Sequence, residues 1–247
     1  GGKGRELGAS RSEEIQRLWA SLRNTLSRGG AALIPCFALG RTQEILSLLY
    51  HGLESGYLPK VPIFCSGLGL DLVDYFDRIS SKGEHVTFRR KILQHLGVRT
   101  LSPKQLKQAG NVQPGIYVLS SGMLVEETPS YRVAARMLGQ SKNGIFFVGY
   151  CDPLTPGGKL LQTPAGQNFV FETLNVSADV LAQVEQFDLS GHADREELLD
   201  FATALAPRSI VLTHGEPKAR QWFQEALPKV LPTTQILDPI PLDVYTV

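Results

Sequence analysis

Apolar residues along the chain recur in two patterns, one typical of amphipathic helices and one of buried strands. After Ser10 and Glu13, which have the spacing of a helix capping box, apolar residues recur every three or four positions until Gly29 and Gly30. Continuous apolar runs alternate with similar helical segments further along the chain. The runs predict buried strands at 31–35, 62–66, 115–122 and 144–150, with helices at 41–53, 70–79 and 130–139.

This alternation of strands and helices predicts an α/β fold, with a mainly parallel sheet flanked by helices on both faces. The pattern changes near residue 160, where KLLQ, NFVFETL and DVLAQVEQFDLS predict shorter, partly antiparallel strands. A helix at 195–205, a strand at 209–214, a helix at 218–227 and a last strand in LDVYTV are then expected. We therefore predict a domain boundary around 175–187.

Composition narrows the class of protein. Of the 247 residues, 43% are hydrophobic and 20% charged, as in an ordinary folded protein, and the longest apolar runs are too short to span a membrane. The three cysteines lack a CxxC spacing and lie in apolar stretches, and the first residues lack a secretory signal, so we expect reduced core thiols and a cytoplasmic protein. The net charge of +1 means that any nucleic-acid partner must be held by local phosphate contacts in a groove.

Two histidines are candidates for chemistry. His214 ends the predicted strand in SIVLTHGEP, and ligands collect at the carboxyl ends of strands in open α/β sheets. A neutral imidazole there suits zinc, although a histidine that hydrogen-bonds to the backbone would also fit. His192 follows Gly191 and precedes a helix for which Asp194 is the expected N-cap, and it suits a general acid beside a phosphate or a structural histidine.

Two loops have the character of phosphate-binding loops. Ser120, Ser121 and Gly122 follow a predicted strand and offer hydroxyls and backbone amides, while Gly40 and Arg41 open a helix and offer a guanidinium. Ordinary turns contain the same residues, so each loop is a weak signal alone.

Taken in order, these segments resemble the β-CASP family of metallo-β-lactamase nucleases. PCFALGRTQEILSLL, LSSGML and GIFFVGY are similar to consecutive segments of that family, LSGHAD is similar to its motif B, and VLTHGEP to its motif C. The resemblance implies a β-CASP domain at 1–186 and the C-terminal segment of a metallo-β-lactamase αββα domain at 187–247.

The resemblance also implies a function, namely zinc-dependent hydrolysis of RNA phosphodiester bonds in RNA processing or decay. It makes His214 a zinc ligand, makes His192 the group that protonates the leaving oxygen, and assigns phosphate or RNA binding to Arg41, Ser120, Ser121 and Gly122. A histidine in motif C is similar to the RNA-processing branch, whereas the DNA-repair branch usually has an aliphatic residue there. The implied cofactor is two Zn²⁺ ions, and the implied partner is RNA.

The family's HxHxDH motif has no counterpart among the histidines at 51, 85, 95, 192 and 214. We therefore expect an incomplete zinc site and a chain that is inactive alone. The missing N-terminal metallo-β-lactamase portion is its expected partner. We expect no membrane partner, and a homodimer remains possible. FCSGLGLDLVDYF and GYCDPLTPGGKLL also depart from the family pattern. Two alternatives remain: a non-catalytic RNA-binding or scaffold protein, and a metallo-hydrolase of small-molecule esters.

Overall fold

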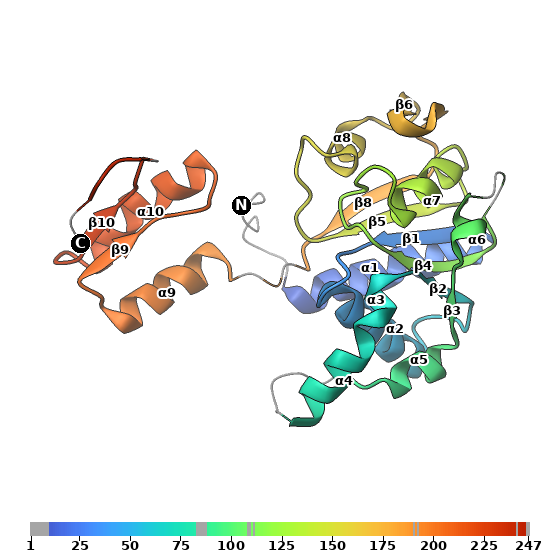
Figure 1. The fold of residues 1–247 in the computed structure, drawn as a ribbon, viewed down its shortest axis with the longest axis horizontal. Helices are drawn as coiled ribbons and strands as arrows, with labels where there is room; N and C mark the ends of the chain where they lie inside the picture. Colours follow the sequence, from blue (N-terminus) through green and yellow to red (C-terminus); the bar gives the residue numbers. More distant parts are fainter. Residues whose placement is uncertain are drawn as a thin grey trace. The chain divides into compact units, whose positions relative to one another are not determined.

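A computed structural model describes residues 10–82, 88–107, 110, 112–189, 191, 193–240 and 242–245 (Figure 1). The chain divides into two compact units. The larger unit is Ala9–Leu189, and the smaller unit comprises Gly1–Gly8 and Ser190–Val247. None of the described helices is long and apolar enough to cross a membrane.

The larger unit is built on a six-stranded sheet in which every neighbouring pair of strands is parallel. Its strand order is β3-β2-β4-β1-β5-β8, so the first strand of the chain lies near the middle. The strands are β1 (Ala31–Pro35), β2 (Ile63–Cys65), β3 (Val98–Thr100), β4 (Gly115–Leu119), β5 (Gly144–Val148) and β8 (Gln183–Phe187). The predicted parallel α/β sheet is therefore confirmed.

Helices cover both faces of this sheet, and each face has its own hydrophobic core. In β1, Ala32 and Ile34 belong to one core, while Ala31 and Leu33 belong to the other, because successive side chains of a strand point to opposite faces. Burial on both faces is the reason that β1, β2, β4 and β5 are continuous apolar runs, whereas the edge strands β3 and β8 are partly exposed and carry polar residues. The first core packs side chains of α1 (Arg11–Ser27), α2 (Arg41–Glu54), α3 (Leu68–Asp71), α4 (Val73–Lys82) and α5 (Lys91–Leu96).

The second core is covered by short helices and a hairpin. These elements are α6 (Pro103–Lys107), α7 (Pro129–Met137), α8 (Pro156–Gln162), and the antiparallel pair β6 (Asn168–Phe171) and β7 (Val176–Asp179), joined by η1 (Glu172–Leu174). The antiparallel strands expected after residue 160 are thus present in β6 and β7. The prediction of a strand was wrong for KLLQ, which lies in helix α8 after the N-cap Thr155 and Pro156 in the first turn. The strand predicted in DVLAQVEQFDLS is present as β8, but it pairs in parallel with β5 of the main sheet.

Local sequence signals account for the other element boundaries. Ser10 and Glu13 form the predicted capping box of α1. The predicted helix 70–79 is two helices, because the chain passes from α3 to α4 at Leu72. The strands predicted at 115–122 and 144–150 end earlier, at Leu119 and Val148, because the residues that follow turn away into loops.

Asn143 joins the amino ends of the two strands that flank β5. Its side chain is 1% exposed, and its Oδ1 accepts a hydrogen bond of 2.9 Å from the backbone N–H of Ala31 at the start of β1. Its Nδ2 donates to the carbonyl of Met137 at the end of α7, and its carbonyl accepts from the N–H of Gln183 in β8. Buried backbone groups need such partners, so this one side chain fixes where β1 begins.

The smaller unit consists of α9 (Arg195–Leu205), β9 (Ser209–Val211), α10 (Pro217–Val230) and β10 (Gln235–Leu237). β9 and β10 pair in parallel. The helix predicted at 195–205 is confirmed, together with the N-cap role of Asp194, whose carboxylate accepts from the N–H groups of Glu196 and Glu197. The strand predicted at 209–214 ends at Val211, and no strand forms in the described residues of the tail.

We predict that Asn143→Ala lowers the free energy of unfolding by about 1–3 kcal/mol, because the buried N–H of Ala31 loses its acceptor. Chemical unfolding in urea would measure the loss. Asn24→Ala, at an exposed position of α1, is the matched control and should change stability by less than about 0.5 kcal/mol. Equal stability of the two variants would contradict the role of Asn143.

Candidate functional site

The candidate site of the larger unit is the edge of the sheet where β1 and β4 end. The two strands are paired in register, with Pro35 opposite Leu119, and the N–H of Cys36 continues the ladder by donating to the carbonyl of Leu119 at 2.9 Å. The chain then leaves β1 into α2, which packs in the first core, and leaves β4 into α7, which packs in the second. Adjacent strands whose connections go to opposite faces form the crevice in which α/β proteins bind ligands.

The two predicted phosphate-binding loops meet in this crevice. A side chain at Gly122 would bring a Cβ within 3.2 Å of the backbone nitrogen of Phe37, so only glycine fits comfortably where the loops touch. Gly40 has a φ of 75° and begins α2 without a side-chain cap. The structure therefore brings Arg41 and the loop of Ser120 to the same edge of the sheet.

The two serines have different environments. The Ser121 hydroxyl accepts hydrogen bonds of 3.3 Å from the N–H groups of Met123 and Val125, and its carbonyl accepts from the hydroxyl of Ser130 at 2.7 Å. The hydroxyl of Ser120 makes no hydrogen bond within the described part of the chain, and the residue is partly exposed. Ser121 thus stabilises the turn, while Ser120 has the hydroxyl that is available to a ligand.

Arg41 is more committed to the fold than its sequence context indicates. Its Nη1 donates to Glu44 Oε2 at 2.6 Å and to the carbonyl of Leu189, and Glu44 also pairs with Arg11. Burial, followed by the charge of Arg11, lowers the pKa of Arg41. Its Nη2 lies 3.8 Å from the position that a Cβ on Gly149 would occupy, close to the loop that follows β5. The guanidinium therefore bonds the start of α2 to the segment after β8, and only part of its donor set is left for a phosphate.

Cys36 lies at the same edge, but its thiol is not a nucleophile. The residue is 1% exposed, and burial raises the pKa of its thiol to about 12, against a smaller opposite effect of the hydrogen bond with Thr42 at 3.4 Å. Burial likewise raises the pKa of Cys65 and of Cys151. All three cysteines are buried, which confirms their predicted positions in the core.

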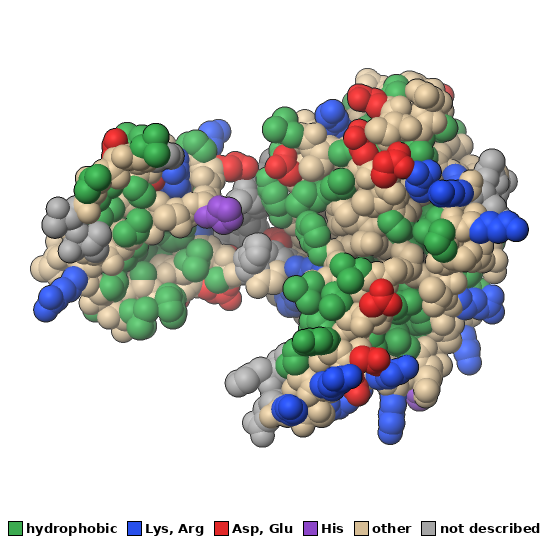
Figure 2. Space-filling view, in the orientation of Figure 1, with side chains coloured by type: hydrophobic (Ala, Val, Ile, Leu, Met, Phe, Trp, Pro, Cys, Tyr) green, Lys and Arg blue, Asp and Glu red, His purple; other side chains and the backbone are tan. Residues whose placement is uncertain are grey.

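Exposed apolar side chains border the crevice, a feature that the sequence pattern did not reveal. Phe37 is 48% exposed and Leu39 69%, in the loop after β1, and Tyr150 and Leu154 are exposed after β5. Figure 2 shows hydrophobic side chains along this side of the larger unit. Aromatic faces beside a cation suit nucleobases, which stack on them whatever their sequence. In a run such as PCFALGR the pattern cannot distinguish a core phenylalanine from an exposed one.

The two candidate histidines belong to the smaller unit. His214 is exposed and has a left-handed backbone, with a φ of 65°, in the turn between β9 and α10. Its imidazole is thus beyond the strand end, in a loop. His192 lies outside the described residues. The roles of both stay predictions.

A zinc site requires at least three protein ligands. Within the described ranges, no three His, Cys, Asp or Glu side chains come together in a way that could hold a metal ion. These residues alone therefore do not fit a zinc centre, and His214 offers a single donor.

Two family models match the chain. One is the Beta-Casp domain, over residues 42–160, which includes β2 to β5 and the loop of Ser120 but begins after β1. The other is described as a Zn-dependent metallo-hydrolase RNA specificity domain and matches residues 177–231, from β7 into the smaller unit. The chain belongs to the β-CASP family of metallo-β-lactamase proteins, as its motifs predict.

Curated relatives lie in three groups of organisms. The chain is 29% identical over 205 residues to Integrator complex subunit 11 of Danio rerio, and 31% identical over 226 residues to Transcription termination factor FttA of Thermococcus kodakarensis. It is 31% identical over 213 residues to Ribonuclease TTHA0252 of Thermus thermophilus. These alignments cover 82%, 83% and 83% of the chain but 33%, 33% and 47% of the relatives, so the chain spans a third to a half of their length.

We predict that Arg41→Ala lowers the free energy of unfolding by about 1–2 kcal/mol, because Glu44 and the carbonyl of Leu189 lose a charged donor. Arg78→Ala, at an exposed position of α4, is the control and should be neutral within about 0.5 kcal/mol. Urea unfolding of both variants would measure the difference. If Arg41→Ala were as stable as the control, the guanidinium would not hold the loops together.

The cysteines give a second test. The thiolate is the reactive form of cysteine, so a raised pKa together with burial protects the thiol from alkylation. We expect Cys36 and Cys65 to resist iodoacetamide near pH 8 in the folded protein and to react in urea. Mass spectrometry would identify the modified positions. Rapid labelling of Cys36 in the folded state would show that the edge opens to solvent.

Proposed function

We propose that this chain is part of a zinc-dependent ribonuclease that hydrolyses RNA phosphodiester bonds in RNA processing or transcription termination. The observation that carries the proposal is the crevice at the ends of β1 and β4, where a cation, a hydroxyl and exposed aromatic side chains come together in a β-CASP domain. The similarity to a ribonuclease and to a transcription termination factor supports it.

In this proposal each of the two predicted domains has its own role in binding or cleaving RNA. Residues 1–186 form the β-CASP domain, which binds RNA through Arg41, the hydroxyl of Ser120 and the amides around Ser121 and Gly122. Phe37 and Tyr150 would stack on the bases. Residues 187–247 belong to the metallo-β-lactamase domain, in which His192 donates a proton to the leaving oxygen and His214 supplies one zinc ligand.

The remaining zinc ligands are proposed to come from outside the chain, because the chain spans only a third to a half of the relatives' length and the described residues offer no complete site. The family model's description supports a zinc-dependent hydrolase, and two ions per site is our proposal. The isolated chain is accordingly proposed to be inactive.

A scaffold protein without catalysis is the main alternative. It shares the crevice but needs neither His192 nor His214, and both histidines are in the sequence. A hydrolase of small esters is less favoured, since an open edge with exposed aromatic residues suits a polymer better than an enclosed small ligand.

We predict that, in the full-length protein, His214→Ala lowers the bound zinc, whereas His192→Ala keeps the zinc and lowers turnover by about 100-fold or more, as expected for loss of a general acid. Elemental analysis and cleavage of a labelled RNA would measure the two effects. Asp194→Ser keeps the cap of α9 and serves as the control with normal turnover. Full activity of both histidine variants would contradict the roles of His192 and His214, whereas absence of cleavage by the wild-type protein would favour the scaffold alternative.

A further inference from the structure

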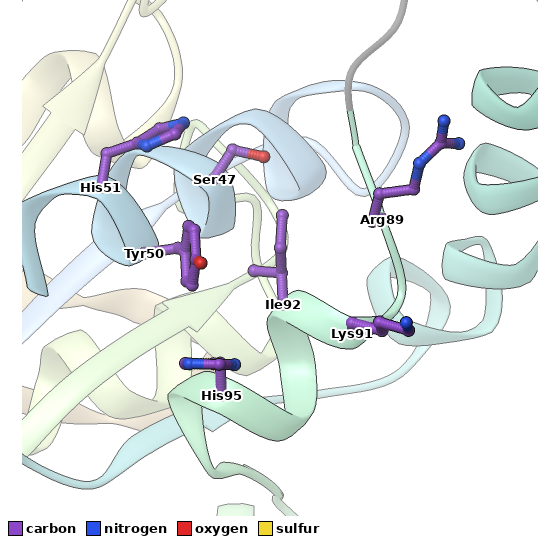
Figure 3. Close-up of a pocket in the computed structure, with 7 residues that line it drawn as sticks. All are labelled: Ser47, Tyr50, His51, Arg89, Lys91, Ile92 and His95. Atoms are coloured by element: carbon purple, nitrogen blue, oxygen red, sulfur yellow. The ribbon is translucent and has the colours of Figure 1, made fainter. Parts of the chain in front are cut away.

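A separate concave site lies between α2 and α5, on the helical layer of the first core. Its volume is about 260 Å³, and its lining residues are Ser47, Tyr50, His51, Arg89, Lys91, Ile92 and His95. Figure 3 shows Ser47, Tyr50 and His51 of α2 on one side, Arg89 and Lys91 on the other, and Ile92 between them. His51 is ten residues beyond Arg41 in the same helix, about 15 Å along its axis, so the pocket is distinct from the crevice.

The pocket is lined by basic residues, of which the two permanent cations have no carboxylate partner among the described residues. Four of its seven lining residues are Lys, Arg or His, and none is acidic. Arg89 Nη1 donates to the neutral hydroxyl of Ser80 at 2.7 Å, and within the described ranges neither Arg89 nor Lys91 pairs with a carboxylate. The neighbouring Arg90 differs, because it is paired with Asp74 at 2.6 Å and lies outside the lining. In a chain of net charge +1, two unpaired cations beside one hollow define an anion site.

Aromatic rings form the other wall. The ring of Tyr50 lies 5.4 Å from that of His95 at 90°, and 5.6 Å from that of His51 at 63°, so it separates the two imidazoles. Ile92 is 9% exposed and forms an apolar floor. Glu54 approaches His95 from outside the lining, with the two side chains 3.9 Å apart. Imidazole N–H groups and a lysine donate to anionic oxygens, while ring faces suit a planar base.

We propose that this pocket binds a single-stranded polynucleotide, with a phosphate group at Lys91 and Arg89 and a base against the rings of Tyr50 and its neighbouring imidazoles. A phosphate matches the site because it accepts several charged hydrogen bonds at once, and an adjoining base would meet the rings. The inference rests on the proposed function only for the identity of the polymer as RNA. The pocket would add a second RNA contact, separate from the crevice at the ends of β1 and β4.

Binding of a short oligouridylate to the 247-residue chain tests the proposal. Lys91→Ala is the chosen variant, because this side chain has no hydrogen bond or ion pair to a described residue and its removal leaves the fold intact. We expect a loss of affinity of about threefold to tenfold at low salt, and a salt slope smaller by about 0.7 for the one lost phosphate contact. Lys60→Ala removes an equal charge at an exposed position outside the pocket and should leave the affinity and slope near those of the wild type.

The imidazole NMR signals of His51 and His95 provide a local readout. Shifts on addition of the oligonucleotide, lost in Lys91→Ala, would support the proposal. Shifts with inorganic phosphate but not with the oligonucleotide would overturn the polynucleotide as the occupant, and equal binding by the Lys91 and Lys60 variants would overturn the site.

Cleavage of a very short RNA by the full-length protein separates this inference from the proposed function. A substrate too short to reach both sites should be cut equally by the wild type and by Lys91→Ala. Absence of cleavage by the wild-type protein would count against the proposed function and leave the pocket to be judged by its binding data.

Discussion

The parallel pairing of β1 with β4 is the constraint on which the rest of the larger unit depends. It brings together two loops that are about eighty positions apart in the sequence, and the bond from Cys36 to Leu119 carries the ladder to the edge. The following helices pack on opposite faces, so this edge is the switch point at which α/β proteins bind ligands. Asn143 holds the start of β1 at the other end of the strand, so both ends of this central strand are fixed by hydrogen bonds.

The same edge contains groups that hold the fold and groups that face solvent. Arg41 ties α2 to Glu44 and to Leu189, and the hydroxyl of Ser121 closes its own turn. Phe37 and Leu39 instead remain exposed although they are apolar, at a cost in hydrophobic burial that a ligand or partner would recover. A polar residue that the fold already satisfies therefore positions the site, and an exposed apolar residue beside it is the better candidate for direct contact.

Much of this fold could be predicted from the sequence, because strands buried on both faces are uninterrupted apolar runs and α1 and α9 carry complete capping boxes. The elements between residues 88 and 107 and strand β10 were missed, since three-residue strands and five- or six-residue helices are shorter than the periods that reveal them. For the site, the loop sequences indicated candidate residues one loop at a time. The bond from Arg41 to the carbonyl of Leu189 joins residues 148 positions apart, and such a long-range contact leaves no local signal. The α2–α5 pocket was missed for the same reason, because its histidines are 44 positions apart.

The near-neutral charge of the chain bears directly on how it would hold a polyanion. With a net charge of +1, binding cannot depend on a broad positive field, so the cations that lack acidic partners must account for most of it. Figure 2 shows Lys and Arg side chains over the part of the larger unit that carries α4 and α5, interspersed with acidic ones. The charges of Arg90 and Asp74 neutralise each other there, whereas Arg89 and Lys91 have no carboxylate partner among the described residues. Contacts of this kind fix a strand at a few points along its length, and between those points the aromatic residues at the crevice can accept bases of any sequence.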